Sequence, residues 1–304
     1  MSDTTWRAPS LGERREVDLS SGTVVYHDAG SGPVLVFVHG YLVNANIWRK
    51  LVPLLTNEFR CLTPDWPLGS HLIPMRREAN LTPIGIAGMI AEFLEALDLR
   101  AVTLVGNDSG GAYSQIAAAR HPDRLARLVL TDCETPDCTW PPTPGGFGLL
   151  KATAAHPASY RALYQVLRVR RTWRWRNTYG RLAKYPINGR VMNSYIRPVL
   201  NDPAIRVDGR KAIGSVSARF SRAAAEELAT RFDKPVLLAW AAEDPVFPLD
   251  HARRFAIRLD APLMTIADSY TYIAEDQPAR TADVLEDWLH ATTTDSTRTA
   301  SGLL

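Results

Sequence analysis

The stretch "TLVGNDSGGAYSQ", residues 103–115, decides the fold. Apolar residues lead into the pattern Gly-x-Asp-x-Gly, and a run of small residues typical of a closely packed helix follows. A reactive side chain on a strained turn between a strand and a helix needs small neighbours two places before and two places after it. Asp108 has Gly106 and Gly110 at those places, whereas Ser109 has a glycine on one side only. The spacing therefore predicts that Asp108 is the reactive residue on this turn.

Predicted strands and helices alternate on either side of the turn. The strands are expected at 15–20, 22–30, 33–40, 60–66, 101–106, 125–132, 234–244 and 261–268, and the helices at 46–59, 81–99, 110–121, 248–259 and 277–291. Such alternation is typical of an α/β fold in which a parallel sheet carries helices on both faces. The fold class expected is a mainly parallel, twisted, eight-stranded sheet.

The alternation stops over residues 133–230, which begin with a Pro/Gly-rich connection and continue with helical patterns. We therefore predict a core domain made of residues 1–132 and 231–291, with 133–230 as a helical cap. The cap is expected over the carboxyl ends of the strands, where open α/β sheets bind ligands. Residues 292–304 are rich in Thr and Ser and are predicted to be a disordered tail.

The composition is that of an ordinary globular protein, with 304 residues of which 46% are hydrophobic and 22% charged. No apolar run approaches the roughly 18 residues of a membrane-spanning helix, and the polar start lacks the apolar core of a secretion signal. The odd set Cys61, Cys133 and Cys138 has no His-rich company, which argues against a metal or disulfide framework. We expect a cytoplasmic protein with reduced thiols, no cofactor, no metal and no membrane partner.

Charge is unevenly distributed along the chain. Residues 141–220 hold 15 Lys and Arg against two acids, a net charge of +13, which leaves −10 for the remainder of a chain whose net charge is +3. A basic block can bind nucleic acid or an anionic ligand, and Trp173 and Trp175 stand among the arginines. Because nothing else resembles a nucleic-acid-binding module, we expect a small-molecule substrate, anionic or aromatic, and no nucleic acid. A solvated Arg-rich face and a homodimer both remain open.

Four stretches give the chain a family resemblance: "FVHGY" at 37–41, "GNDSGG" at 106–111, "WAAEDPVFP" at 240–248 and "DSYTYIAEDQP" at 268–278. With them the chain resembles the α/β-hydrolase fold from about residue 15 to about residue 290. The aspartate at the turn is similar to that of haloalkane dehalogenases, haloacetate dehalogenases and epoxide hydrolases. The resemblance implies that Asp108 attacks an electrophilic carbon and forms an ester with it.

The resemblance also implies roles for residues around Asp108. Backbone N–H groups of Tyr41 and Ser109 would face the substrate as oxyanion-hole donors. His39, in the His-Gly turn, and Asn107, beside the nucleophile, would line the site, His39 as a structural histidine rather than a base.

The acid of the triad is implied at Asp244, which follows the next-to-last core strand in "WAAEDPVFP". The fold has a second acid position after the sixth strand, where Asp132 or Glu134 can serve. The sequence does not choose between these two.

The base that hydrolyses the ester is missing from its expected place. The similar enzymes use a histidine just after the last strand to activate water. Here Tyr270 stands in the place of the preceding glycine, Thr271 in that of the histidine and Tyr272 in that of the following aromatic residue. A tyrosine with an ordinary pKa near 10 is a poor base at neutral pH. His71 and His156 lie on segments that can reach the site.

The groups that hold a leaving halide also differ. The similar dehalogenases place Trp or Arg directly after the nucleophile, and many haloalkane dehalogenases place Asn after His-Gly, whereas this chain has Ser109 and Tyr41 there. Epoxide hydrolases instead protonate the epoxide oxygen with tyrosines of the cap. The cap segment offers five of these, at Tyr160, Tyr164, Tyr179, Tyr185 and Tyr195.

Three hypotheses follow. The first is a hydrolase-family enzyme that acts on an epoxide or another electrophilic carbon through an Asp108 ester, without the usual histidine. The second is a non-hydrolytic enzyme in which Asp108 acts as acid or base in cyclisation, isomerisation, elimination or epoxide opening. The third is a catalytically inert, ligand-binding relative.

Overall fold

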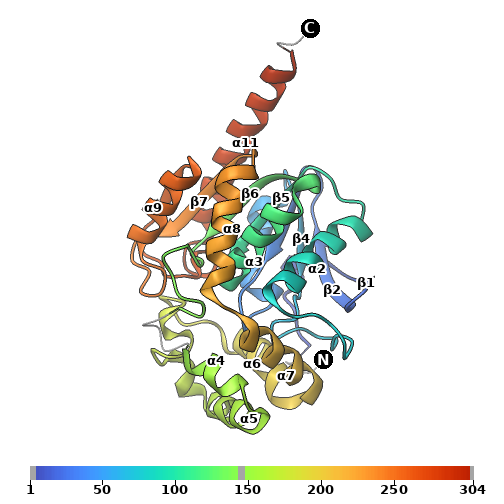
Figure 1. Cartoon of the computed structure of the whole chain (residues 1–304), viewed down its shortest axis with the longest axis vertical. Coiled ribbons are helices and arrows are strands. Elements are labelled where there is room, and N and C mark those ends of the chain that lie inside the picture. Colours follow the sequence, from blue (N-terminus) through green and yellow to red (C-terminus); the bar gives the residue numbers. More distant parts are fainter. Residues whose placement is uncertain (1–4, 143–147, 302–304) are drawn as a thin grey trace.

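One eight-stranded sheet forms the centre of the protein (Figure 1). The computed structural model describes residues 5–142 and 148–301, with side chains as far as Thr292. The strand order is β1-β2-β4-β3-β5-β6-β7-β8. β1 pairs antiparallel with β2, and β2 with β4, whereas all later neighbours are parallel. The bounds are β1 Glu13–Leu19, β2 Gly22–Ala29, β3 Val34–Val38, β4 Arg60–Pro64, β5 Val102–Asn107, β6 Leu125–Thr131, β7 Val236–Ala241 and β8 Leu263–Ile266.

Helices cover both faces of this sheet, as the sequence predicts. The central strands β5 and β7 are buried along their whole length, as expected of parallel strands enclosed between two helical layers. The core helices are α1 Val52–Leu55, α2 Pro83–Ala96, α3 Ser109–Arg120, α8 Ala218–Arg231, α9 Leu249–Leu259, α10 Ile273–Asp276 and α11 Pro278–Ser301. α2, α3 and α8 form one continuous layer, while α1 packs against α11.

Local sequence explains where two of these helices begin. α2 starts at Pro83, two residues after the start of the range predicted, and the preceding Thr82 caps it by accepting a hydrogen bond from the Gly85 N–H at 3.3 Å. The single helix predicted over 46–59 is wrong, because the chain forms a 3-10 turn, η2 (Ala45–Trp48), and then the short α1. Pro53 has no N–H to donate to an earlier turn, so it fits only at the start of a new helix.

The cap lies over one end of the sheet (Figure 1). It contains α4 Gly148–Ala154, α5 Pro157–Gln165, α6 Gly189–Asn201 and α7 Pro203–Ser215, with the 3-10 turns η4 Val166–Arg168, η5 Arg170–Arg174 and η6 Tyr179–Arg181 between α5 and α6. The predicted cap boundary at 230 is too late, because α8 packs along α3 in the core. Ala224 and Ala225 on the buried side of α8 are small, which lets the two helices approach closely.

The carboxyl-terminal segment corrects another prediction. The tail expected to be disordered from Thr292 continues α11 as far as Ser301, and residues 302–304 lie outside the described residues. No Gly or Pro occurs between Pro278 and Gly302, so nothing in the sequence interrupts the helix.

Within the described ranges, no helix combines the length and the apolar character needed to cross a membrane. In the same ranges, no three His, Cys, Asp or Glu side chains are grouped as metal ligands. Cys61, Cys133 and Cys138 are buried free thiols.

Candidate active site

Asp108 lies on a strained turn between β5 and α3. Its backbone has φ 54° and ψ −140°, a conformation that non-glycine residues adopt only where the surroundings enforce it. A Cβ atom at Gly110 would lie 2.1 Å from the Val38 carbonyl oxygen, and one at Gly106 would lie 2.6 Å from the Gly111 Cα. The glycine spacing that singled out Asp108 is therefore a packing requirement of the turn.

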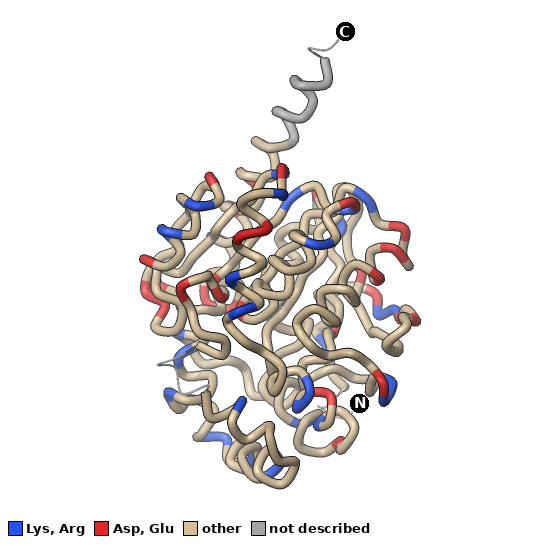
Figure 2. Tube along the Cα trace, viewed as in Figure 1, with Lys and Arg blue, Asp and Glu red and all other residues tan. Residues whose placement is uncertain are grey.

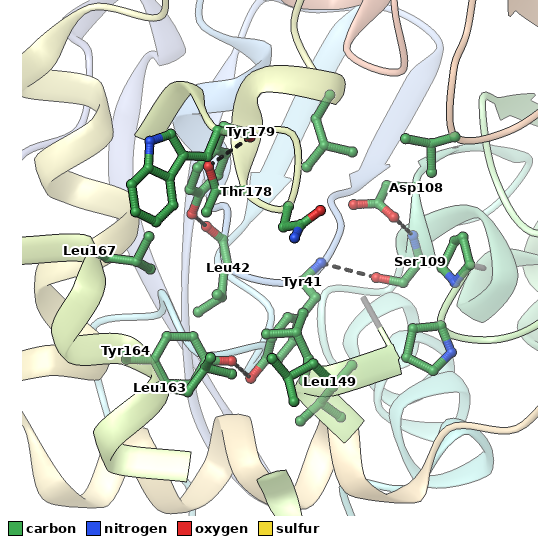
Figure 3. A pocket seen from close by; sticks show the side chains of 18 of the residues that line it. Tyr41, Leu42, Asp108, Ser109, Leu149, Leu163, Tyr164, Leu167, Thr178 and Tyr179 are labelled. Atoms are coloured by element: carbon green, nitrogen blue, oxygen red, sulfur yellow. Dashed lines mark hydrogen bonds between the residues drawn. The ribbon is translucent and has the colours of Figure 1, made fainter. Parts of the chain in front are cut away.

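Backbone groups hold the Asp108 carboxyl. The Ser109 N–H donates to Asp108 Oδ1 at 2.7 Å, at the positive end of the α3 dipole (Figure 3). On the other side, a Cβ at Gly40 would lie 2.4 Å from Asp108 Oδ2, so only glycine leaves room for the carboxyl there. These contacts fix the carboxyl toward the space under the cap.

The two predicted oxyanion-hole donors have different partners from those expected. The Ser109 N–H serves Asp108 itself, and the Tyr41 N–H donates to the Ser109 hydroxyl oxygen at 3.0 Å (Figure 3). Neither faces open space, because the side chains of Asp108 and Ser109 fill the positions in front of them. When water attacks an ester formed on Asp108, negative charge would develop on a carboxyl oxygen of Asp108. The Ser109 N–H already lies beside that carboxyl.

A cavity of about 450 Å³ separates Asp108 from the cap. Among its described lining residues, Asp108 and Glu134 are the only acids, and none is Lys, Arg or His. The rest of the lining is mostly apolar and includes Leu149, Leu163, Leu167, Leu182, Ile213 and Val246. The cavity is therefore suited to an apolar ligand.

Burial perturbs Asp108. Loss of solvent raises its pKa to about 7; the charge of Asp244 acts in the same direction, and the Ser109 N–H opposes both. Asp108 keeps some accessible surface because it borders the cavity, but the protein encloses its carboxyl. Near neutral pH the protonated and ionised forms are both populated.

Glu134 is the second acid of the cavity. It follows β6, is 1% exposed, and neither of its carboxyl oxygens has a hydrogen-bond partner among the described residues. Burial, and then the charge of Asp108, raise its pKa well above the usual range. Its backbone is held by Gln115, whose Nε2 donates to the Glu134 carbonyl at 2.7 Å. The sequence left Glu134 and Asp132 as alternatives, and Glu134 is the one that borders the cavity.

Asp132 and Asn107 support the site from outside the cavity. Asp132 Oδ1 accepts the Ala241 N–H at 2.8 Å, so this acid connects β6 to β7 instead of facing a ligand. Asn107 Nδ2 donates to the Thr131 carbonyl at 3.1 Å and to the Thr271 carbonyl at 2.8 Å. The expectation that they line the site is therefore corrected to a supporting position, because neither residue borders the cavity and each bonds to backbone groups of neighbouring segments.

Thr271 and Asp244 meet, as expected of a triad acid and its partner. The Thr271 hydroxyl lies 2.9 Å from Asp244 Oδ2, and Asp244 Oδ1 accepts the N–H groups of Val246 and Phe247 at 2.7 and 3.1 Å. Burial raises the pKa of Asp244 to about 6, although the hydrogen bonds from these donors act to lower it. The threonine thus gives Asp244 a partner but adds no group that can accept a proton near neutral pH.

The two tyrosines beside Thr271 lie outside the cavity. Tyr270 is directed outward, where the Lys184 ammonium group lies 5.9 Å from its ring centre, so its predicted place in the lining is wrong. Tyr272 is fully buried with an unpartnered hydroxyl. Burial, and then the charge of Asp108, raise the pKa of Tyr272 well above its ordinary value. Neither residue supplies a base.

No described lining residue is a histidine. His39 accepts the Trp66 N–H on Nε2 at 2.9 Å and has Nδ1 2.9 Å from the Gly40 carbonyl. Burial lowers its pKa to about 4, and the expectation that His39 lines the site is corrected, because both ring nitrogens lie against backbone groups outside the cavity. His71 is buried against Asp208 at 3.2 Å, and His156 is exposed at the start of α5.

Hydroxyl groups gather at another side of the cavity. The Tyr41 hydroxyl contacts those of Tyr160 and Tyr164, the latter at 2.9 Å, and the Tyr179 hydroxyl donates to the Leu42 carbonyl at 2.7 Å. Figure 3 shows Tyr164 directed toward Tyr41 and away from Asp108. The sequence does not distinguish among the cap tyrosines. Tyr164 and Tyr179 are the cap tyrosines that line the cavity, and only the packing of the cap on the core shows this.

Comparison with known proteins identifies relatives with the same fold. "Haloalkane dehalogenase 2" of Mycobacterium tuberculosis is 29% identical over 275 residues, covering 89% of this chain and 92% of the relative. Haloalkane dehalogenase DatA of Agrobacterium tumefaciens, solved as a variant, superposes with a TM-score of 0.76 at 20% identity, covering 93% of this chain and all of DatA. Epoxide hydrolase CorEH gives a TM-score of 0.72 at 18% identity over 92% of this chain and 99% of CorEH. The last two similarities concern the fold.

The profile of one family, described as "alpha/beta hydrolase fold", matches residues 33–276. That span runs from β3 to α10 and includes Asp108, Asp244 and Thr271. The chain therefore belongs to the α/β-hydrolase fold family.

Proposed function

We propose that the protein is a hydrolase that opens an epoxide on a small apolar molecule through a covalent ester on Asp108. The observation that carries the proposal is that two acids, Asp108 and Glu134, border one otherwise mostly apolar cavity under the cap. The same lining favours a neutral substrate over the anionic one suggested by the basic cap sequence.

The pair can complete a cycle without a histidine. Ionised Asp108 attacks an epoxide carbon, the carbon–oxygen bond breaks, and protonated Glu134 gives its proton to the departing oxygen. Glu134 is then ionised. It takes a proton from a water molecule while that water attacks the ester carbonyl. The diol leaves, Asp108 is again a carboxylate and Glu134 is again protonated, so the atoms and charges balance.

Contacts of both acids support these roles. The raised pKa of Glu134 favours its protonated form while Asp108 is ionised, as in other carboxyl pairs that share one proton. Both Glu134 oxygens are closed off from solvent, but no hydrogen bond holds them. The carboxyl can therefore turn toward a substrate in the cavity without breaking a hydrogen bond to another residue.

The residues of the site favour an epoxide over a halide, although the sequence relative is named a haloalkane dehalogenase. The relative named haloalkane dehalogenase and the neighbour named epoxide hydrolase are both consistent with a substrate that has an electrophilic carbon. Halide displacement requires donors for the halide, and the expected positions hold Ser109 and Tyr41, whose N–H groups are already used. An alkoxide needs a proton instead, which Glu134 can supply.

Isotope labelling tests the covalent step. The protein is incubated with styrene oxide in water labelled with heavy oxygen for many turnovers and then digested, and the peptide containing Asp108 is weighed. We expect heavy oxygen in Asp108, because water attacks the ester carbonyl and leaves one of its atoms in the carboxyl. Turnover without label in Asp108 would exclude the ester, and no turnover of styrene oxide or a straight-chain terminal epoxide would exclude the substrate class.

The pH dependence of kcat/KM follows from Asp108. Attack requires the ionised carboxylate of Asp108, and the pKa of this carboxyl is raised to about 7. The value of kcat/KM for styrene oxide should therefore fall about tenfold for each pH unit below pH 7. We expect a rise from pH 5 that levels off above pH 7. A profile that is flat between pH 5 and 8 would contradict a nucleophile with this pKa.

One observation favours a second candidate. With a pKa near neutrality, Asp108 can also act as a proton donor or acceptor, as in the non-hydrolytic hypothesis. Product from styrene oxide that contains no oxygen from water, together with an unlabelled Asp108, would favour that candidate.

A further inference from the structure

Five exposed arginines lie in the cap segment that also contributes Trp175 to the cavity lining. They lie in "RVRRTWRWRN", residues 168–177, which runs through η4, η5 and the turn after it: Arg168, Arg170, Arg171, Arg174 and Arg176. None of the five forms an ion pair with a described residue. Arg168 donates to the Gln165 side chain, and the Arg170 guanidinium lies 5.8 Å from the Trp173 ring centre. We call these five residues the arginine patch.

The exposed arginines of α9 are compensated by acids. On α9, Arg253 pairs with Asp250 at 2.6 Å and Arg254 pairs with Asp137 at 2.7 Å, while Arg258 lies 3.9 Å from Glu226. Figure 2 shows Lys and Arg without Asp or Glu over the part of the cap that contains α4 and α5. The arginine patch therefore keeps its positive charge, whereas acids near α9 balance that helix.

Large apolar side chains are exposed beside the patch. Leu149 is 58% exposed, and Val169 and Trp175 are each 50% exposed. Leu149 and Trp175 also line the cavity, so this apolar surface continues from the outside of the cap into the site. Exposed apolar residues at a charged entrance indicate contact with another apolar phase.

We propose that the arginine patch docks the cavity entrance onto the surface of an anionic lipid bilayer, so that apolar substrates enter from the lipid. Arginines near such a surface attract its negative headgroups, and Trp and Leu side chains insert at the boundary of the acyl chains. An acidic protein or a nucleic acid would pair with the arginines but would leave Leu149 and Val169 in water.

The arrangement of the molecule allows this docking. α11 leaves the body at the end opposite to the cap, so a membrane beneath the cap does not meet it (Figure 1). The sequence expectation of no membrane partner rested on the absence of a spanning segment, and surface binding needs none. The docking does not depend on the chemistry proposed for Asp108.

Sedimentation with vesicles tests the docking. The wild type should bind phosphatidylcholine vesicles that contain phosphatidylglycerol, and much less those without it. Arg168→Ser/Arg171→Ser/Arg174→Ser should weaken this binding about 100-fold, since each arginine contributes about a fivefold factor. The matched control, Arg253→Ser/Arg254→Ser/Arg258→Ser, removes the same formal charge and should change binding less than about threefold. Added salt should weaken binding of the wild type.

Trp175→Ser separates a bilayer from a soluble polyanion. We expect it to weaken vesicle binding about tenfold and to leave binding to heparin unchanged, because only the bilayer has an apolar interior. Absence of wild-type binding to the anionic vesicles, equal losses in both triple variants, or no effect of Trp175→Ser on vesicles would each overturn the proposal. The last result would point to an acidic macromolecule.

Discussion

Asp108→Asn is expected to lower the turnover of styrene oxide by at least about 10⁴-fold, because the amide cannot form the ester. The Ser109 N–H can still donate to the amide oxygen, as it does to Asp108 Oδ1, so the turn should keep its geometry. Initial rates and the mass of the intact protein measure the effect. Asp250→Asn, an exposed acid on α9, is the control and should keep wild-type turnover. Full turnover by Asp108→Asn would exclude both catalytic hypotheses.

The same variant should be more stable than the wild type at neutral and higher pH. The folded-state pKa of Asp108 is raised to about 7, so the folded protein binds this proton more tightly than the unfolded chain does. Wild-type stability is therefore lost as pH rises from about 4 to about 7, and Asn removes that loss. Melting temperatures of both proteins should diverge over that window. A constant difference between pH 4 and 8 would contradict the raised pKa.

Glu134→Gln is expected to lower turnover by about 10²- to 10⁴-fold, the usual contribution of acid–base catalysis. Formation of the ester on Asp108 should be slowed, and the ester that does form should persist. Glutamine fills the same space but can neither protonate the alkoxide nor take a proton from water. The measurement is the mass of the Asp108 peptide after incubation with styrene oxide. If heavy oxygen enters Asp108 of the wild type but Glu134→Gln has unchanged turnover, the ester mechanism is supported and the role of Glu134 is excluded.

Adding Thr271→His to Glu134→Gln should restore release of the ester. The Thr271 side chain already contacts Asp244, so an imidazole there would have an acid beside it and Asp108 nearby. Thr271→Val in the same Glu134→Gln background is the matched control, since it replaces the hydroxyl without adding a base, and it should not restore release. A wild type that is inert toward epoxides but becomes active through Thr271→His alone would favour the ligand-binding hypothesis.

The alternation of apolar runs and helical segments in the sequence predicted most of the fold. All eight strands were expected, and the order of helices between them followed, because apolar runs with helices between them can bury themselves only as a parallel sheet. The errors occur where tertiary packing overrides composition. The Thr-rich end of α11 continues a helix already formed, and α8 belongs to the core because its alanines pack on α3.

The site was predicted less completely. Asp108, Asp244 and Thr271 follow from positions in motifs, and the structure brings the last two into contact. The importance of Glu134 over Asp132 was not predictable, since the two acids are separated by a single residue and differ only in what surrounds them. Asp132 accepts the Ala241 N–H, and Glu134 has no partner for either oxygen.

The sequence by itself determined the α/β architecture and the place of Asp108 on its turn. Both depend on local sterics: the period of the apolar residues, and glycines where a Cβ would collide with neighbouring backbone. Only the tertiary structure decided that Glu134 borders the cavity, that Tyr164 meets Tyr41, and that the arginine patch is exposed in a segment that lines the cavity through Trp175. These properties depend on contacts between segments far apart in the chain, and those contacts exist only after the cap has folded over the sheet.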